Sequence, residues 1–174
     1  MRAGYLLLAS LLTLPVQAKS AFETYGDIGQ YALPALAAGF SWYQGDTEGL
    51  QQFGYALGST VVTVEVLKHS VDATRPNGEE QSFPSGHSAL AFSGAGYLQM
   101  RYGWQYGVPA YLAAGAVGWS RVSAHEHYWR DVIAGAAIAV GFDYLFTTPS
   151  GQQFSLYPAI LDDEAQGVAF NYQF

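Results

Sequence analysis

Apolar residues recur along the chain in five stretches, which are separated by loops rich in glycine, proline and charged residues. The stretches run over residues 28–43, 50–67, 88–100, 107–119 and 132–146. Each is longer than a typical strand, and alternation with a period of two residues is weak within them. They contain many small side chains, which suit helices that pack closely together. The pattern therefore predicts an all-α domain built as a helical bundle.

The remainder of the chain adds a segment at each end of this bundle. Residues 1–18 have the order of a secretory signal: Arg2, then an apolar run, then small residues ending at Ala18. We expect cleavage after Ala18; the alternative is a short first membrane helix, although the run is shorter than the roughly 20 residues of a span. Residues 19–146 form the helical domain, and residues 147–174 form a tail that we expect to pack on it, with a strand-like alternation near its end.

Composition narrows the class of protein. Of the 174 residues, 50% are hydrophobic and only 12% are charged, which excludes a disordered chain. Seven Lys and Arg stand against 14 Asp and Glu, so the chain lacks the basic clusters that bind nucleic acid. Cysteine is absent, which excludes disulfides and a thiol nucleophile. The mean hydropathy is only +0.07, which favours an exported bundle in or on the membrane boundary over a set of short true spans.

Two clusters of unusual polar residues lie between the second and third apolar stretches. In the first, Lys68 ends an apolar helix and Arg75 precedes Pro76, so two cations reach one loop. The alternative is a pair of solvated surface charges. In the second, Pro84-Ser85-Gly86-His87 comes directly before the third stretch, where backbone N–H groups at a helix start attract an anion. The alternative there is a plain capping turn.

A third cluster follows the fourth apolar stretch. Arg121 closes that helix, and His127 and Asp131, four residues apart, are expected to share a face of the helix that follows. A carboxylate one turn from an imidazole can fix its tautomer and make the other nitrogen a better nucleophile. His125, His127 and Asp131 could instead ligate a metal, but the cations of the three clusters would repel one. Together the clusters supply cations, backbone N–H donors and imidazoles, which are the groups needed to hold a phosphoryl group.

These clusters resemble the signature of the type 2 phosphatidic acid phosphatase and vanadium haloperoxidase superfamily: Lys-x6-Arg-Pro, Pro-Ser-Gly-His and Ser-Arg-x5-His-x3-Asp. The resemblance covers roughly residues 50–146. It implies a bundle of five to six helices with the active site at one end. Every fixed position is present in identity, order and spacing: Lys68 with Arg75-Pro76, Pro84-Ser85-Gly86-His87, and Ser120-Arg121 with His127 and Asp131.

The resemblance also implies a role for each residue. His127 would be the nucleophile that forms a phosphohistidine, Asp131 would orient it, and His87 would be the general acid. The resemblance implies no metal and no cofactor. His69 and His125 match no fixed position. The phosphate would be bound by Lys68, Arg75, Arg121, Ser85 and Gly86.

We therefore expect a phosphatase acting on a phosphomonoester or pyrophosphate, on a lipid or isoprenoid carrier or a small molecule. The expected setting is the bacterial cell envelope, either periplasmic or membrane-embedded with the site facing the periplasm. A phosphotransferase or a vanadate-dependent haloperoxidase could use the same pocket. A non-enzymatic protein that binds phosphate or lipid is the alternative from another class.

Overall fold

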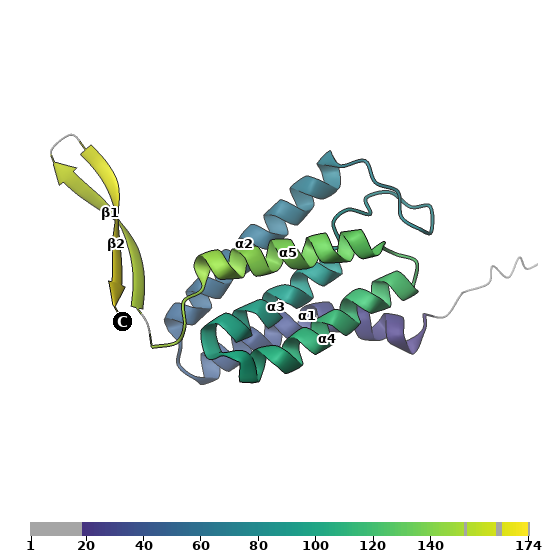
Figure 1. The fold of residues 1–174 in the computed structure, drawn as a ribbon, viewed down its shortest axis with the longest axis horizontal. Helices are drawn as coiled ribbons and strands as arrows, with labels where there is room; N and C mark the ends of the chain where they lie inside the picture. Colours follow the sequence, from purple (N-terminus) through teal and green to yellow (C-terminus); the bar gives the residue numbers. More distant parts are fainter. Residues whose placement is uncertain (1–18, 152, 163–164, 174) are drawn as a thin grey trace, which may run out of the picture.

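The computed structural model describes residues 19–151, 153–162 and 165–173, so the signal expected at residues 1–18 lies outside it. An α-helix covers each of the five apolar stretches, which confirms the all-α class of the domain (Figure 1). Within the described residues, no helix combines the length and hydropathy of a membrane span. The helices are α1 (Ala21–Tyr43), α2 (Thr47–Ser70), α3 (Gly86–Tyr102), α4 (Trp104–Ser123) and α5 (Trp129–Phe146).

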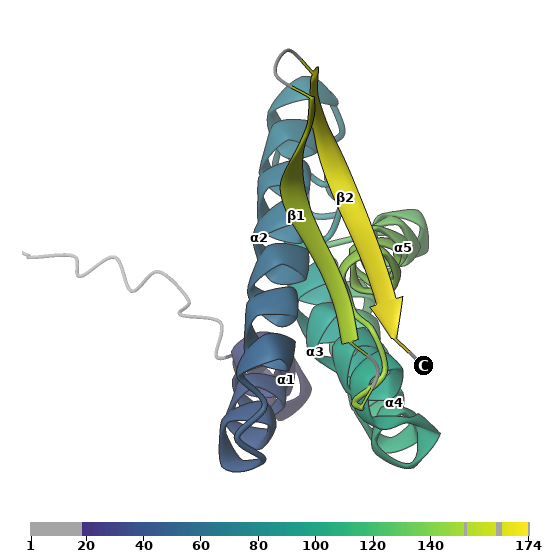
Figure 2. The ribbon, with the colours of Figure 1, turned by 90° about the vertical axis from the view of Figure 1, so that its left-hand side faces the viewer.

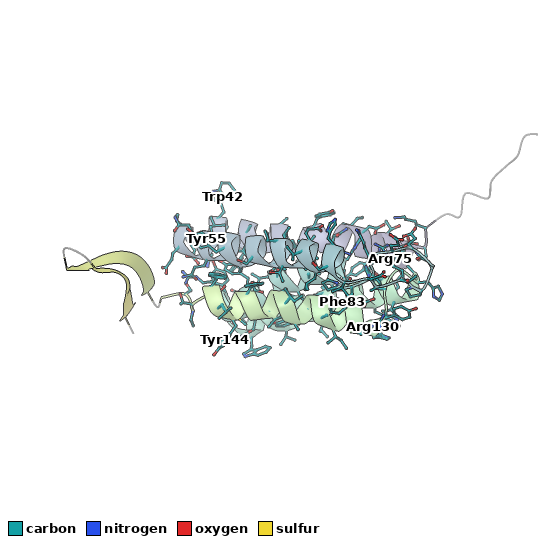
Figure 3. The ribbon with its side chains drawn as sticks, turned by 90° about the horizontal axis from the view of Figure 1, so that it is seen from above. Trp42, Tyr55, Arg75, Phe83, Arg130 and Tyr144 are labelled. Carbon is teal, nitrogen blue, oxygen red and sulfur yellow. The ribbon has the colours of Figure 1, made fainter. Side chains whose placement is uncertain are left out.

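Consecutive helices run in opposite directions, and α3 lies in the middle of the bundle, where it contacts all four others (Figures 1 and 2). One end of the bundle therefore collects the beginnings of α1, α3 and α5 and the ends of α2 and α4. Arg75, Phe83 and Arg130 lie at this end, whereas Trp42, Tyr55 and Tyr144 lie at the other (Figure 3). The three polar clusters of the sequence thus meet at one end of the bundle.

Each helix begins before its apolar stretch, and polar side chains cap the starts of α1, α2 and α3. Ser20 Oγ accepts a hydrogen bond from the Glu23 N–H (3.0 Å) at the start of α1. Asp46 Oδ1 accepts one from the Gly49 N–H (2.8 Å) at the start of α2. Such caps satisfy N–H groups that lack a partner within the helix. Hydropathy alone does not mark them, so the predicted helices were too short.

The core consists mostly of small side chains. Leu33 of α1 packs with five residues of α3 and α4 in one cluster. Phe53 and Tyr97 form a second cluster with Ala37, and the Tyr97 hydroxyl lies 2.6 Å from Ser41 Oγ. Small side chains let the helix backbones approach closely, which confirms the packing that the composition predicted. The five partners of Leu33 are Ala91, Ala95, Ala110, Ala114 and Val117.

The start of the tail is fastened to the bundle at the end opposite the polar clusters. Buried Arg101 donates two hydrogen bonds of 2.7 Å to Asp46, one from Nε and one from Nη2. Its Nη1 donates to the carbonyl of Thr148 (2.8 Å), and its own carbonyl accepts from the Ser150 N–H (2.7 Å). This bidentate ion pair joins the α1–α2 turn, the end of α3 and the tail.

The rest of the tail differs from the expectation. It forms an antiparallel hairpin of β1 (Gln153–Asp162) and β2 (Ala165–Gln173), with Gln153 opposite Gln173. The strand near the end of the chain is confirmed. However, the described strands contact each other and none of the helices, and they extend beyond the bundle (Figures 1 and 2). The prediction that the whole tail packs on the bundle was wrong, because the strands satisfy their backbone hydrogen bonds with each other.

Asp143 is a polar residue in the core of the bundle that no sequence pattern singled out. Its side chain is fully buried in α5, and neither carboxyl oxygen has a hydrogen-bond partner. It faces α3, where a Cβ added to Gly96 would lie 2.4 Å from Asp143 Oδ2. Burial raises the pKa of Asp143 to about 9, so the folded protein holds this carboxyl in its neutral form.

We predict that Asp143→Asn raises the melting temperature, and that the gain grows between pH 5 and pH 9. The pKa of this carboxyl is higher in the folded protein than in the unfolded chain. Its contribution to the free energy of unfolding is therefore complete below the unfolded pKa near 4 and is lost as pH rises towards 9. The Asn side chain does not titrate, so its contribution to the free energy of unfolding does not change with pH. Thermal unfolding across this range, with exposed Asp72→Asn as the control, measures the effect; a gain independent of pH would contradict it.

Candidate active site

Backbone hydrogen bonds hold together the two loops that carry the polar clusters. The α2–α3 loop is closed on itself where the Ser82 N–H donates to the carbonyl of Ala73 (2.8 Å). It joins the α4–α5 loop through the Asn77 N–H and the His125 carbonyl (3.1 Å). The Ser85 N–H donates to the carbonyl of Asp131 (3.0 Å), at the start of α5. Residues far apart in the sequence are thereby fixed next to one another.

Lys68 and Arg75 flank one side of this site. Lys68 is half-buried at the end of α2, and its Nζ donates to the carbonyl of Gln81 (3.0 Å). A Cβ added to Gly86 would lie 3.7 Å from Lys68 Cε, so the Lys68 side chain passes the start of α3. Burial and then the charge of Arg75 lower the pKa of Lys68. The Nε of Arg75 is buried and has no hydrogen-bond partner among the residues that the structure describes, which leaves a guanidinium donor available for an anion.

Arg121 occupies the other side of the site. It lies at the end of α4, its side chain is only 2% exposed, and its Nε donates to Ser120 Oγ (3.1 Å). Its Nη1 donates to Asp27 Oδ1 of α1 (2.7 Å), and its Nη2 donates to the carbonyl of Glu23. α1 passes this close because residue 26 is glycine.

Two histidines, His127 and His87, lie among these cations. His127 has a side chain that is 3% exposed. Burial, followed by the charges of Lys68 and Arg75, lowers its pKa to about 4. His87, on the first turn of α3, is partly exposed, and burial followed by the charge of Arg121 lowers its pKa to about 4. Both imidazoles are therefore neutral in the ligand-free protein at neutral pH.

The pairing of His127 with Asp131 differs from the expectation. His127 precedes α5, which begins at Trp129, so the two residues do not share a helix face. His127 Nδ1 lies 3.8 Å from Asp131 Oδ2, which is too long for a hydrogen bond. Asp131 Oδ2 instead accepts hydrogen bonds from Ser82 Oγ (2.5 Å) and the Tyr128 N–H (3.0 Å). The carboxylate thus caps α5, which is why the helix starts after His127.

The start of α3 is the third part of the site. Ser85 is its N-cap, fully buried, and its Oγ accepts hydrogen bonds from the N–H (3.4 Å) and the hydroxyl (3.0 Å) of Ser88. Ser85 Oγ is therefore an acceptor for the first turn of α3, and its role in binding phosphate stays a prediction. Gly86 and His87 follow as the first helical residues, and N–H groups at this position have no partner within a helix. They present the positive end of α3 to the site.

Sequence reasoning missed two carboxylates in the site. Asp27 pairs with Arg121, and Glu126 pairs with Arg75. Asp27 comes from α1, outside the motifs, and Glu126 occupies a position that the motif leaves free. The available signal was charge: Asp27 is an acidic residue near the start of a largely apolar stretch. In the ligand-free protein these carboxylates occupy guanidinium donors that an anionic ligand requires.

The remaining histidines lie outside this arrangement. His69 is exposed, and its Nδ1 lies 2.7 Å from the carbonyl of Glu65. His125 is exposed at a turn with φ of 58°. Among the residues that the structure describes, no three His, Cys, Asp or Glu side chains are grouped as a metal site. The side chains that meet at this end of the bundle are thus three cations and two imidazoles, accompanied by the carboxylates of Asp27, Glu126 and Asp131.

Comparison with known proteins assigns this set of residues to a family. The PAP2 superfamily profile matches residues 49–153, which contain all three clusters. The chain belongs to the PAP2 superfamily. This PAP2 protein is 32% identical to the lipid A 4'-phosphatase of Helicobacter pylori, over 87% of this chain and 84% of the relative. It is also 32% identical to the lipid A 1-phosphatase of Porphyromonas gingivalis, over 87% of this chain but only 40% of that relative.

A solved structure has the same fold. The crystal structure of Aquifex aeolicus LpxE matches this PAP2 protein with a TM-score of 0.64 and 24% sequence identity, covering 71% of this chain and 81% of the other. This confirms the helical architecture that the resemblance implied.

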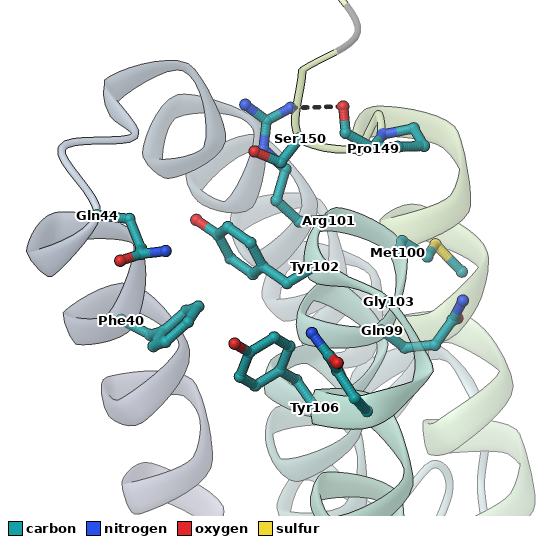
Figure 4. Close-up of a pocket in the computed structure, with 11 residues that line it drawn as sticks. Phe40, Gln44, Gln99, Met100, Arg101, Tyr102, Gly103, Tyr106, Pro149 and Ser150 are labelled. Carbon is teal, nitrogen blue, oxygen red and sulfur yellow. Dashed lines mark hydrogen bonds between the residues drawn. The ribbon is translucent and has the colours of Figure 1, made fainter.

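A cavity of about 590 Å³ lies at the opposite end of this PAP2 protein, beside Phe40, Tyr102 and Tyr106 (Figure 4). Its cation, Arg101, has all three guanidinium nitrogens bonded to Asp46, Thr148 and Pro149. The charge of Arg101 is thus paired with Asp46 and directed into the protein, so it serves to join the α1–α2 turn, α3 and the tail.

We predict that Gly26→Ala weakens phosphate binding about 10- to 100-fold, because small displacements of binding groups have effects of this size. A Cβ at Gly26 would lie 1.9 Å from Ser120 Oγ and 2.5 Å from Arg121 Nη2, so Arg121 must move. Titration calorimetry with inorganic phosphate measures the change.

The matched control for this variant is Gly39→Ala in the same helix. A Cβ at Gly39 has no neighbour within 4 Å, so phosphate affinity stays unchanged. Helix stability rises by about 0.5–1 kcal/mol. Equal phosphate affinity in Gly26→Ala and Gly39→Ala would contradict the assigned role of Gly26.

Proposed function

We propose that this PAP2 protein is a phosphatase that hydrolyses a phosphomonoester or pyrophosphate of an envelope lipid through a phosphohistidine on His127. The observation that carries the proposal is the position of His127, buried between the charges of Lys68 and Arg75. Burial and these charges keep the imidazole neutral, and a neutral imidazole has the lone pair that attacks phosphorus. The same cations attract the phosphate dianion and stabilise charge in the transition state.

The reaction has two steps in which atoms and protons balance. A ring nitrogen of His127 forms a bond to phosphorus as the bond to the leaving oxygen breaks. His87, in the protonated form that is the minor one in the ligand-free protein at neutral pH, donates its proton to that oxygen. Neutral His87 then takes a proton from water, whose oxygen attacks phosphorus and breaks the phosphorus–nitrogen bond. Inorganic phosphate leaves, and both histidines return to their starting states.

Lys68, Arg75 and Arg121 hold the phosphate oxygens in this proposal, together with the N–H groups at the start of α3. Arg75 contributes its unpartnered buried Nε. Arg121 contributes the Nη1 that Asp27 occupies in the ligand-free protein. These groups belong to the protein itself, so we propose that turnover needs no metal and no cofactor. Asp131 contributes by capping α5, which fixes the segment that carries His127.

We propose a lipid A-type phosphate as the substrate. Two relatives that each align with 87% of this chain are lipid A phosphatases, one named for the 4'-phosphate and the other for the 1-phosphate. The residues proposed here to hold the phosphate do not distinguish the two positions, so both are substrates to test. Phosphatidic acid, phosphatidylglycerol phosphate and undecaprenyl pyrophosphate carry the same phosphoryl group and complete the panel.

We further propose that the protein is exported and works at the membrane boundary of the cell envelope, with the active site facing the periplasm. The outer helices expose large apolar side chains: Trp42 is 78%, Leu112 73% and Tyr144 77% exposed. Such a surface is typical of contact with another apolar phase. Recovery in the membrane fraction after spheroplast lysis, with release by detergent, supports this setting; recovery in the cytosol would contradict it.

We predict that His127→Ala lowers phosphate release from the lipid panel by about 10³-fold or more, because it removes the nucleophile. His69→Ala is the matched control, since His69 is exposed and contacts only a backbone carbonyl of its own helix. Its rate stays at the level of the unmodified protein. Phosphate release is measured with purified protein in detergent, and circular dichroism checks folding. Full turnover by His127→Ala would refute the mechanism.

A further inference from the structure

Asp27 of α1 contacts three charged or titratable groups at the mouth of the site. Its Oδ1 accepts a hydrogen bond from Arg121 Nη1 (2.7 Å) and lies 3.3 Å from His87 Nε2. Its Oδ2 accepts one from Lys19 Nζ (2.8 Å). The side chain is 29% exposed, so it is open to both solvent and ligand. One oxygen thus lies between a phosphate-binding guanidinium and the general acid.

We propose, on the basis of the function proposed above, that Asp27 is a positioning residue that holds His87 and Arg121 in place and favours the protonated imidazole. A carboxylate oxygen between a guanidinium and an imidazole occupies the kind of position that a phosphate oxygen would take. It orients both groups before substrate binds. It also competes with the substrate, because two anions repel each other when they share one guanidinium.

Three charged groups act on His87, and they come from three different helices. Arg121 of α4 and Lys68 of α2 oppose its protonation, as does burial. Asp27 of α1 is the group that favours it. Lys68 in turn faces Arg75, Glu65 and Asp131. Removing the charge of Asp27 therefore leaves His87 with only opposing influences, and its pKa falls further.

Asp27 is itself held in the charged form. Burial opposes its charge, but the hydrogen bond from Lys19 and the charge of Arg121 hold the pKa of Asp27 below its usual value. Lys19 is largely exposed, with 61% of its side chain accessible, and it also lies 3.8 Å from Glu23. Lys19 is thus a point at which the positive charge beside Asp27 can be removed without changing a buried side chain.

The variant Asp27→Asn tests this proposal through two opposite effects. Inorganic vanadate inhibits it about two- to fivefold more strongly than the unmodified protein, since a competing carboxylate is gone. Its kcat for an alkyl phosphate falls at pH 7, and the falling limb of its pH profile moves to lower pH, because protonated His87 is scarcer. With p-nitrophenyl phosphate the loss is smaller, since that leaving group needs little protonation. A purely structural role would reduce the rates with both substrates alike and would leave the pH profile unshifted.

Two further variants keep the test decisive. Asp27→Glu retains the charge and restores the pH profile in part. Lys19→Gln, at an exposed position, removes a positive charge next to Asp27, so the falling limb of the kcat/KM profile moves to higher pH, opposite to Asp27→Asn. If Asp27→Asn does not fold, the direction of the Lys19→Gln shift decides. Asp72→Asn on an exposed loop position is the control for lost charge.

The result that would overturn the proposal is an Asp27→Asn protein whose vanadate inhibition and pH profile equal those of Asp72→Asn. A Lys19→Gln profile displaced to lower pH would do the same. Failure of the proposed function looks different, because His127→Ala would then retain activity on the same substrates. The two failures are therefore distinguishable within one set of assays.

Discussion

Positive charges placed close together in a half-buried site repel one another and need an anion among them. Lys68, Arg75 and Arg121 come from two helix ends and a loop, and burial of Lys68 together with the charge of Arg75 lowers the pKa of Lys68. In the ligand-free protein, Asp27 and Glu126 supply the compensating charge. In the function proposed here, a substrate phosphate supplies it instead when bound. Binding would then depend on the exchange of carboxylate for phosphate.

The bundle makes this arrangement possible by bringing five helix ends together. α3 packs against all other helices, so its first turn is fixed at the centre of the site. Hydrogen bonds between loops do the rest: Ser85 is tied to Asp131, and Asn77 to His125. At the opposite end, the ion pair of Arg101 with Asp46 closes the bundle without leaving a cation free. The positive charge of Arg101 is therefore neutralised by Asp46 at one end of the bundle. At the other end, we propose that a phosphate can replace the carboxylates that pair with Arg75 and Arg121.

Much of this arrangement could be predicted from the sequence. The five apolar stretches located the helices, and residues at their ends, such as Lys68 and Arg121, were correctly placed where loops begin. The motif spacing indicated which residues meet. Other features depend on tertiary contacts that spacing does not contain. His127 lies before α5 and not on it, because Asp131 caps the helix with its own side chain. Asp27 reaches the site only because α1 crosses the end of α4.

A crystal structure of the protein with orthovanadate tests the central claim most directly, because vanadate adopts the geometry of the phosphoryl group in the transition state of its transfer. The account predicts vanadium bonded to a ring nitrogen of His127, with its oxygens held by Lys68, Arg75 and Arg121 and with Asp27 no longer bonded to Arg121. Vanadate bound elsewhere, or bound at this end of the bundle with His127 uninvolved and the Arg121–Asp27 pair intact, would contradict it.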